Sequence, residues 1–170
     1  AFGGCKSIAS ITIPKSVRKI GGAFMGCENL AEVTISEGVT EIDESTFSLC
    51  VNLTTVKLPN SLTKIGEQAF LGCTKLVNIT IPEGVTEIGV NAFSSCENLA
   101  NVSIPNSVTL IGEGAFIKCV SLTDIVIPNS VKKIDQFAFS LCDGLKSIVI
   151  PSSVDTIVSA AFGGCGNLEK

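Results

Sequence analysis

The sequence of 170 residues contains no Trp, no Tyr and no His. Without His, nucleophilic catalysis at a Ser or Cys would need a carboxylate or a Lys as base, and no Asp or Glu recurs regularly enough to suggest such a dyad. Zinc sites usually combine His with closely spaced Cys pairs, and the sequence has no C-x-x-C pair either. We therefore expect no catalytic residue, no metal site and no cofactor.

The sequence also lacks an excess of positive charge and a long hydrophobic run. Sixteen acidic residues outnumber twelve basic ones, which gives a formal net charge of −4, whereas nucleic-acid-binding domains usually carry a basic patch. Mean hydropathy is +0.49, but Lys, Glu, Asn or Pro interrupts every apolar stretch well before the roughly 20 residues of a spanning helix. We expect no nucleic-acid partner and no membrane insertion.

What the sequence does contain is a repeat. Self-similarity at a period of 20 to 50 residues is typical of solenoids, in which each unit buries its apolar side chains against its neighbours. Cysteines recur here at a spacing of about 23 residues, within that range, and only the first interval is one residue shorter. A Phe precedes each of them by three positions, and the cysteines are Cys5, Cys27, Cys50, Cys73, Cys96, Cys119, Cys142 and Cys165. The sequence thus predicts one domain, residues 1–170, of about seven coils.

Each unit carries a short alternating pattern followed by a turn. In one unit the apolar residues Val56 and Leu58 enclose a polar position, and Pro59 follows. Such alternation predicts a half-buried strand, which the Pro ends because it cannot donate a hydrogen bond. A second apolar pair, Leu62 and Ile65, predicts a brief extended segment on the opposite side of the coil. The Ala-Phe pair before each cysteine predicts a short helical or 3₁₀ turn.

The stacking of coils makes two predictions about side chains. Parallel cysteine side chains in neighbouring coils would keep their Cβ atoms about 5 Å apart, beyond the usual 3.5–4.5 Å of a disulfide, so we expect buried, reduced thiols. At one surface position the charge alternates between successive coils, with Lys19, Glu41, Lys64 and Glu87. These side chains should pair along the stack, each exposed pair contributing about 0 to 1 kcal/mol.

The outward positions of the first strand carry mainly short hydroxyl and amide side chains. On a rigid sheet such groups can hydrogen-bond a partner at little cost in side-chain entropy, although Thr and Ser also simply suit strands and solubility. Both interpretations stay open, and the apolar Val126 and Val149 favour contact in the C-terminal half. The candidate partner-binding residues are Thr55, Lys57, Asn78, Thr80, Asn101, Ser103, Asp124, Val126, Ser147 and Val149.

The run LANVSIPNSVTLIGEGAFIKC, residues 99–119, resembles the BspA-like, or Treponema-type, leucine-rich repeat, and the resemblance covers essentially the whole chain. It implies a leucine-rich-repeat solenoid of the β-rich α/β class, with right-handed coils of about 23 residues and a parallel β-sheet on the concave face. It also implies an extracellular or cell-surface location, no catalytic residues, and adhesion to host matrix proteins, mucosal surfaces or other microbes.

Three functions fit these observations. The first is a non-catalytic adhesion module of a bacterial or protist surface protein, which binds a protein or a surface glycan through the concave sheet. The second is a structural spacer with no ligand of its own, and the third is an intracellular protein-interaction scaffold. The chain opens with AFGGC and closes with AFGGCGNLEK, both within the repeat. We therefore expect a piece of a longer array, uncapped at both ends and able to associate end to end.

Overall fold

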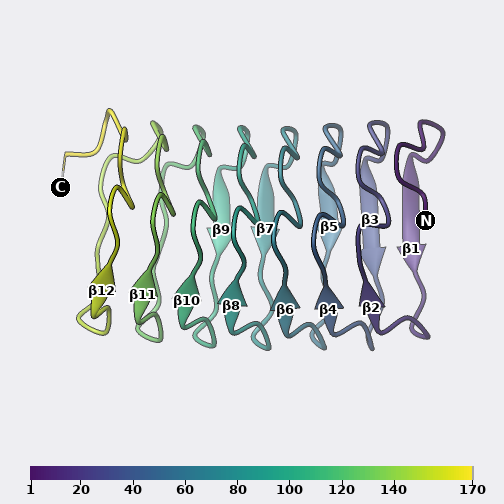
Figure 1. The fold of residues 1–170 in the computed structure, drawn as a ribbon, viewed down its shortest axis with the longest axis horizontal. Coiled ribbons are helices and arrows are strands. Elements are labelled where there is room, and N and C mark those ends of the chain that lie inside the picture. Colours follow the sequence, from purple (N-terminus) through teal and green to yellow (C-terminus); the bar gives the residue numbers. More distant parts are fainter. Residues whose placement is uncertain (170) are drawn as a thin grey trace.

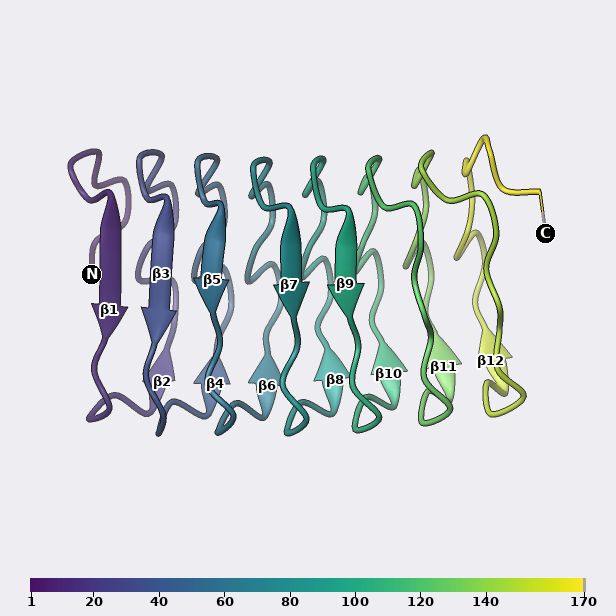
Figure 2. The same ribbon diagram turned by 180° about the vertical axis from the view of Figure 1, so that it is seen from behind.

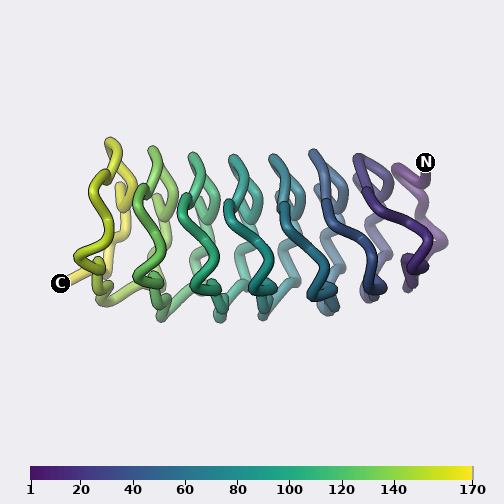
Figure 3. Tube along the Cα trace, turned by 90° about the horizontal axis from the view of Figure 1, so that it is seen from below, coloured from purple at the N-terminus to yellow at the C-terminus, as the bar shows by residue number. Residues whose placement is uncertain are grey.

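The computed structural model describes residues 1–169 as a stack of similar coils. Figure 3 shows these coils side by side in chain order, with the N-terminal and C-terminal coils at opposite ends of the stack. Short strands lie on two opposite sides, and turns connect them (Figures 1 and 2). The structure is therefore the predicted solenoid with a repeat of about 23 residues, since a residue's strand partner is the equivalent residue of the next coil.

One side of the stack is a continuous parallel sheet of two-residue strands. Strand pairing runs through the sheet in the order β12-β11-β10-β8-β6-β4-β2. Its second positions hold one Ile per coil, such as Ile65 paired with Ile88, and these side chains are buried in all coils but the last. The strands are β2 (Lys19–Ile20), β4 (Glu41–Ile42), β6 (Lys64–Ile65), β8 (Glu87–Ile88), β10 (Leu110–Ile111), β11 (Lys133–Ile134) and β12 (Thr156–Ile157). The brief extended segment predicted here is confirmed.

The opposite side, expected as one parallel sheet, is interrupted. Its strands form a three-stranded sheet, β1-β3-β5, and a separate pair, β7-β9 (Figure 2). Residues 124–127 and 147–150, at the equivalent positions of the next two coils, form no strand. The strands are β1 (Ser10–Ile13), β3 (Glu32–Ile35), β5 (Thr55–Lys57), β7 (Asn78–Thr80) and β9 (Asn101–Ser103).

Proline gives one physical reason for the short ladders on this side. In all units but one a Pro follows the strand position, whether or not a strand forms there, and its missing N–H cannot extend the pairing. The exception has Ser36, whose N–H donates to the Ile13 carbonyl at 3.0 Å. This bond extends the pairing of β1 with β3 to Ile13 and Ile35, so both strands have four residues. The strands β5, β7 and β9 have three residues each.

The segment before each cysteine forms tight turns, and residues 1–169 contain no helix. Their hydrogen bonds are of the 3₁₀ kind, as when Leu71 N donates to Gln68 O at 3.1 Å and Cys73 N to Phe70 O at 3.2 Å. Two residues in the left-handed region, Gln68 (φ 53°) and Gly72 (φ 68°), lie within this segment. A left-handed residue cannot continue a right-handed helix, so the expected helical turn is limited to single turns.

The core consists of columns of identical side chains. Phe rings of successive coils stack nearly parallel, with centroids 5.3–5.5 Å apart, and those from Phe24 to Phe139 are almost fully buried. All eight cysteines are free. The buried ones donate their S–H to a Phe carbonyl of the preceding coil, as Cys96 does to Phe70 at 3.2 Å. The predicted packing role of these thiols is confirmed.

No helix in the described part of the chain is long and apolar enough to cross a membrane.

Candidate functional site

The candidate residues share one surface, which we call the strand face. It consists of the outward side chains of β1, β3, β5, β7 and β9 and of segments 124–127 and 147–150. All of the predicted partner-binding residues are exposed there. Because consecutive coils stack in register, they form two rows along the stack. The first row is Thr55, Asn78, Asn101, Asp124 and Ser147, and the second row is Lys57, Thr80, Ser103, Val126 and Val149.

Strand alternation explains why these side chains point outward. In β7 and β9 the central residues Ile79 and Val102 are buried and the flanking residues are exposed. The two strands pair in register, so Asn78 lies opposite Asn101. Asn101 Nδ2 donates to Asn78 Oδ1 at 2.7 Å. This bond restricts both amides, so the centre of the first row presents preoriented polar groups.

A first hollow of about 350 Å³ lies between β5 and β7, where the strand ladder is interrupted. Lys57, Asn60, Asn78 and Thr80 supply its polar lining, and Val56 and Ile79 supply part of its apolar lining. We call it the polar hollow. Its cation and amide groups can hydrogen-bond an anionic or amide group of a partner.

A second hollow of about 440 Å³ lies between segments 124–127 and 147–150, where strand pairing is again absent. Val126 and Val149 line it and are 80% and 81% exposed, whereas no other large apolar side chain of residues 1–169 exceeds 51%. Asp124 and Ser147 also line it. The two exposed valines make the C-terminal half the more apolar part of the strand face. We call this second hollow the apolar hollow.

Charges are few on the strand face. Its charged outward residues are Glu32, Lys57 and Asp124, and no ion pair within 4.0 Å involves them in residues 1–169. Lys57 is thus an exposed cation without a carboxylate partner in the described chain.

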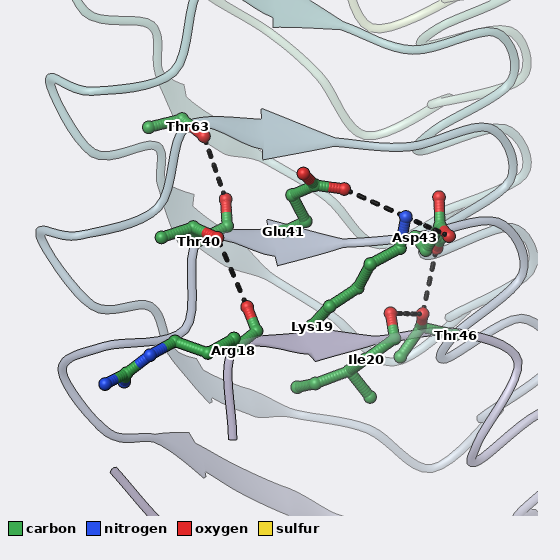
Figure 4. A network of polar contacts seen from close by, with 8 residues as sticks. All are labelled: Arg18, Lys19, Ile20, Thr40, Glu41, Asp43, Thr46 and Thr63. Carbon is green, nitrogen blue, oxygen red and sulfur yellow. Dashed lines mark hydrogen bonds and ion pairs between the residues drawn. The ribbon is translucent and has the colours of Figure 1, made fainter. Parts of the chain in front are cut away.

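The ion pairs concentrate instead on the opposite, continuous sheet. Lys19 Nζ lies 3.0 Å from Glu41 Oε2 and 3.0 Å from Asp43 Oδ2 (Figure 4). The Asp43 hydrogen bond, followed by that of Glu41, raises the pKa of Lys19, and the same Lys19 contact lowers the pKa of Asp43. Of the alternating charges predicted to pair along the stack, only Lys19 and Glu41 do so within 4.0 Å in residues 1–169. Lys64 forms no such pair with either Glu41 or Glu87 in this part of the chain.

Hydroxyl groups on the same sheet bind the main chain of the preceding coil. Thr40 Oγ1 donates to Arg18 O at 3.3 Å, and Thr63 Oγ1 donates to Thr40 O at 3.0 Å (Figure 4). Thr46, which replaces the usual Ala before Phe, is buried and contacts the Ile20 carbonyl oxygen at 2.9 Å. These groups hydrogen-bond successive coils to each other, so their polar atoms are already engaged within the stack.

Burial also affects the chemistry of the cysteines. It raises the pKa of Cys50 and Cys142 to about 12, and it raises the pKa of Cys73, Cys96 and Cys119 well above the ordinary thiol value. A thiolate is the nucleophilic and metal-binding form of cysteine, and burial disfavours it. In residues 1–169 no group of three or more His, Cys, Asp or Glu could hold a metal ion.

Two features of the strand face do not follow from the sequence pattern. The hollows were not predicted, because interruption of a ladder depends on the spacing between coils. Asn60 lines the polar hollow although it lies in the turn after Pro59. The only sequence signal for it is that this turn position varies between coils, with Lys15, Glu37, Asn60 and Glu83.

The chain matches a known family along its length. The model of the BspA type leucine rich repeat region matches in six copies, over residues 1–122 and 109–170. No curated protein matches the chain. The solved structures similar to it include two that share its fold and at least 30% sequence identity. A leucine-rich repeat protein from Bacteroides ovatus is 39% identical, with a TM-score of 0.86, and the match covers 91% of this chain and 40% of that one.

The second such structure is a leucine-rich repeat protein from T. pallidum. It is 30% identical with a TM-score of 0.90, and the match covers 96% of this chain and 79% of that one. A leucine rich cell surface protein from Faecalibacterium prausnitzii is 26% identical with a TM-score of 0.51, over 99% of this chain and 74% of that one. This chain thus spans less than half the length of the B. ovatus protein. From the family match and these structures, the chain belongs to the BspA-type leucine-rich repeat family.

Proposed function

We propose that the array is a non-catalytic binding module of a cell-surface or secreted bacterial protein, and that its strand face holds a macromolecular partner, a protein or a surface glycan. The observation that supports this most is the exposure of every candidate residue on one face, in two rows that extend over five consecutive coils. These side chains are mostly short and stand on a rigid stack, so ordering them on binding costs little entropy.

Three further observations support the proposal. Solenoid proteins commonly use an extended face of the stack for binding. The similar F. prausnitzii protein is described as a cell surface protein, which favours a surface location for this chain. The raised pKa values of the buried thiols disfavour nucleophilic chemistry.

A retention assay, in which beads that carry the chain are applied to surfaces coated with possible partners, tests this function. We expect beads that carry the chain to be retained by at least one surface in a panel of purified matrix proteins, mucin and microbial cells. Asn101→Arg places a long charged side chain in the centre of the first row and should abolish retention. Thr109→Arg is the matched control, because Thr109 is exposed next to β10 on the opposite sheet. Both variants should melt within a few degrees of the wild-type temperature by circular dichroism, since each position is exposed and each change removes only one exposed hydrogen bond.

A stiff spacer is the second candidate, and it has its own supporting observation. The continuous sheet from β2 to β12 and the unbroken column of stacked Phe rings link all coils. A spacer without a ligand would give the same retention for wild type, Asn101→Arg and Thr109→Arg. That result would contradict the binding proposal.

A further inference from the structure

The second row changes in character along the stack. It begins with the cation Lys57, continues with the hydroxyls of Thr80 and Ser103, and ends with the isopropyl groups of Val126 and Val149. The polar hollow lies beside the cation, and the apolar hollow lies beside the two valines. One face thus presents two hollows of different chemistry with hydroxyl side chains between them.

We propose that the strand face binds an extended segment of a partner protein that runs along the stack, with an acidic side chain in the polar hollow and an aliphatic side chain in the apolar hollow. The inference rests on the proposed function and specifies its ligand. A carboxylate fits the polar hollow because Lys57 offers an ammonium group, while Asn60, Asn78 and Thr80 offer additional donors. An aliphatic side chain fits the apolar hollow because it would cover two valines that are four-fifths exposed.

The distance between the hollows sets the spacing of the two side chains. Lys57 and Val126 are three coils apart, and the Phe rings give a spacing of 5.3 Å per coil over this region. Three spacings amount to about 16 Å, and an extended chain advances about 3.3 Å per residue. Side chains of an extended chain alternate between its two faces, so two residues that enter hollows on one face lie an even number of positions apart. The acidic and aliphatic residues should therefore lie four or six positions apart in the partner.

Charge also determines which of the two hollows the acidic side chain of the segment occupies. Asp124 lines the apolar hollow and would repel an acidic side chain there. The carboxylate of the partner is therefore favoured only at the Lys57 end. Between the two hollows, the hydroxyls of Thr80 and Ser103 can hydrogen-bond the main chain of the segment. Such bonds do not depend on the partner's sequence.

Peptide selection tests the inference while the partner itself is still unidentified. A phage library of random dodecapeptides is selected on the immobilised chain at low ionic strength. We expect enrichment of peptides with Asp or Glu four or six positions from Val, Ile or Leu. Selection on Lys57→Glu should yield Lys or Arg at the acidic position, and peptides selected on wild type should bind this variant at least about tenfold more weakly, which corresponds to about 1.4 kcal/mol.

Matched variants separate the site from general charge effects. Lys75→Glu makes the same charge change at an exposed turn position away from the strand face and should leave the selected peptides bound. Val126→Ser with Val149→Ser should remove the aliphatic preference, whereas Val90→Ser, at another exposed valine, should retain it. Lys57→Gln removes the cation without adding a negative charge and should give an intermediate loss.

The outcomes distinguish this inference from the proposed function. Peptides whose binding is lost in Asn101→Arg, but which lack the acidic and aliphatic pattern, would overturn the inference and leave the binding function intact. Peptides that bind Lys57→Glu and wild type equally would also overturn it. A selection that yields no peptide sensitive to Asn101→Arg would overturn the inference, whereas the binding function is overturned only if retention on the coated surfaces is the same for wild type and Asn101→Arg.

Discussion

Each buried cysteine donates its S–H to a Phe carbonyl in the preceding coil and is removed from water, as Cys96 shows. In the unfolded chain thiols ionise above a pH of about 8.5, whereas burial raises the pKa of the folded thiols and keeps them protonated at that pH. Above this pH the unfolded state therefore binds fewer protons than the folded state. The free energy of unfolding should fall as pH rises, by about 1.4 kcal/mol per pH unit for each buried thiol. The loss continues up to the folded pKa, about 12 for Cys50 and Cys142.

Replacing one thiol measures this effect at a single residue. For Cys96→Ala we expect the slope of unfolding free energy against pH, between about pH 9 and 10, to be shallower than that of wild type by about 1.4 kcal/mol per pH unit. Urea denaturation at several pH values gives both slopes, and other titrating groups cancel in the comparison. Equal slopes would show that Cys96 ionises alike in the folded and unfolded states.

At the scale of elements, the turn after each strand of the continuous sheet limits how closely coils approach. A Cβ atom on Gly89 would lie 2.7 Å from the carbonyl carbon of Gly66 and 2.8 Å from Ile65 O. These are main-chain atoms of the preceding coil and cannot move aside without displacing it. On Gly21, at the equivalent position of the shortened first coil, a Cβ atom would meet only the Asp43 side chain, at 3.4 Å or more.

The two glycines therefore make a matched pair for mutation. Gly89→Ala should lower the free energy of unfolding by about 3 kcal/mol, because it separates two coils or strains both. Gly21→Ala should change it by less than about 0.5 kcal/mol. Urea denaturation followed by circular dichroism measures both, and similar losses for the two variants would refute the proposed main-chain contact.

Sequence patterns predict the elements of one side of the stack better than those of the other. Ile65 and Ile88 recur at the expected spacing and pair in the continuous sheet, because burial of one face fixes their register. The interrupted pairing between Lys57 and Thr80 could not be predicted, because both strands have the same alternating pattern as their paired neighbours. Left-handed Phe137 and Leu141 were also unexpected, since only some of their equivalents, such as Gly114 and Gly164, are glycines.

For the whole molecule, the repeat makes the architecture predictable but not the specificity of the strand face. Identical columns such as the Phe rings are fixed by the period of the sequence, and the exposure of Asn78 and Asn101 follows from alternation. The hollows beside Lys57 and Val126 arise from small differences in how successive coils pair. Those differences are cooperative properties of the stack, so no single unit's sequence predicts them.

The stack should also unfold as a linear array, in which each coil is stabilised by its two neighbours. Phe93 is fully buried and stacks at 5.3 Å on the ring before it and the ring after it. Phe93→Ala should therefore destabilise the chain by about 3 to 5 kcal/mol. Phe2 is 45% exposed and stacks only on Phe24, and Phe2→Ala, the terminal control, should cost about 1 kcal/mol or less, since little area is uncovered.

Hydrogen exchange read by mass spectrometry locates the effect. In Phe93→Ala we expect amides of β8 and β10 to lose protection first, while amides of β2 and β4 remain protected, because the weakened interface lies between the two halves of the array. In Phe2→Ala the loss should be confined to the first coil. A uniform loss of protection in Phe93→Ala would mean that the stack unfolds as one cooperative unit, and nearest-neighbour stacking would then not explain its stability.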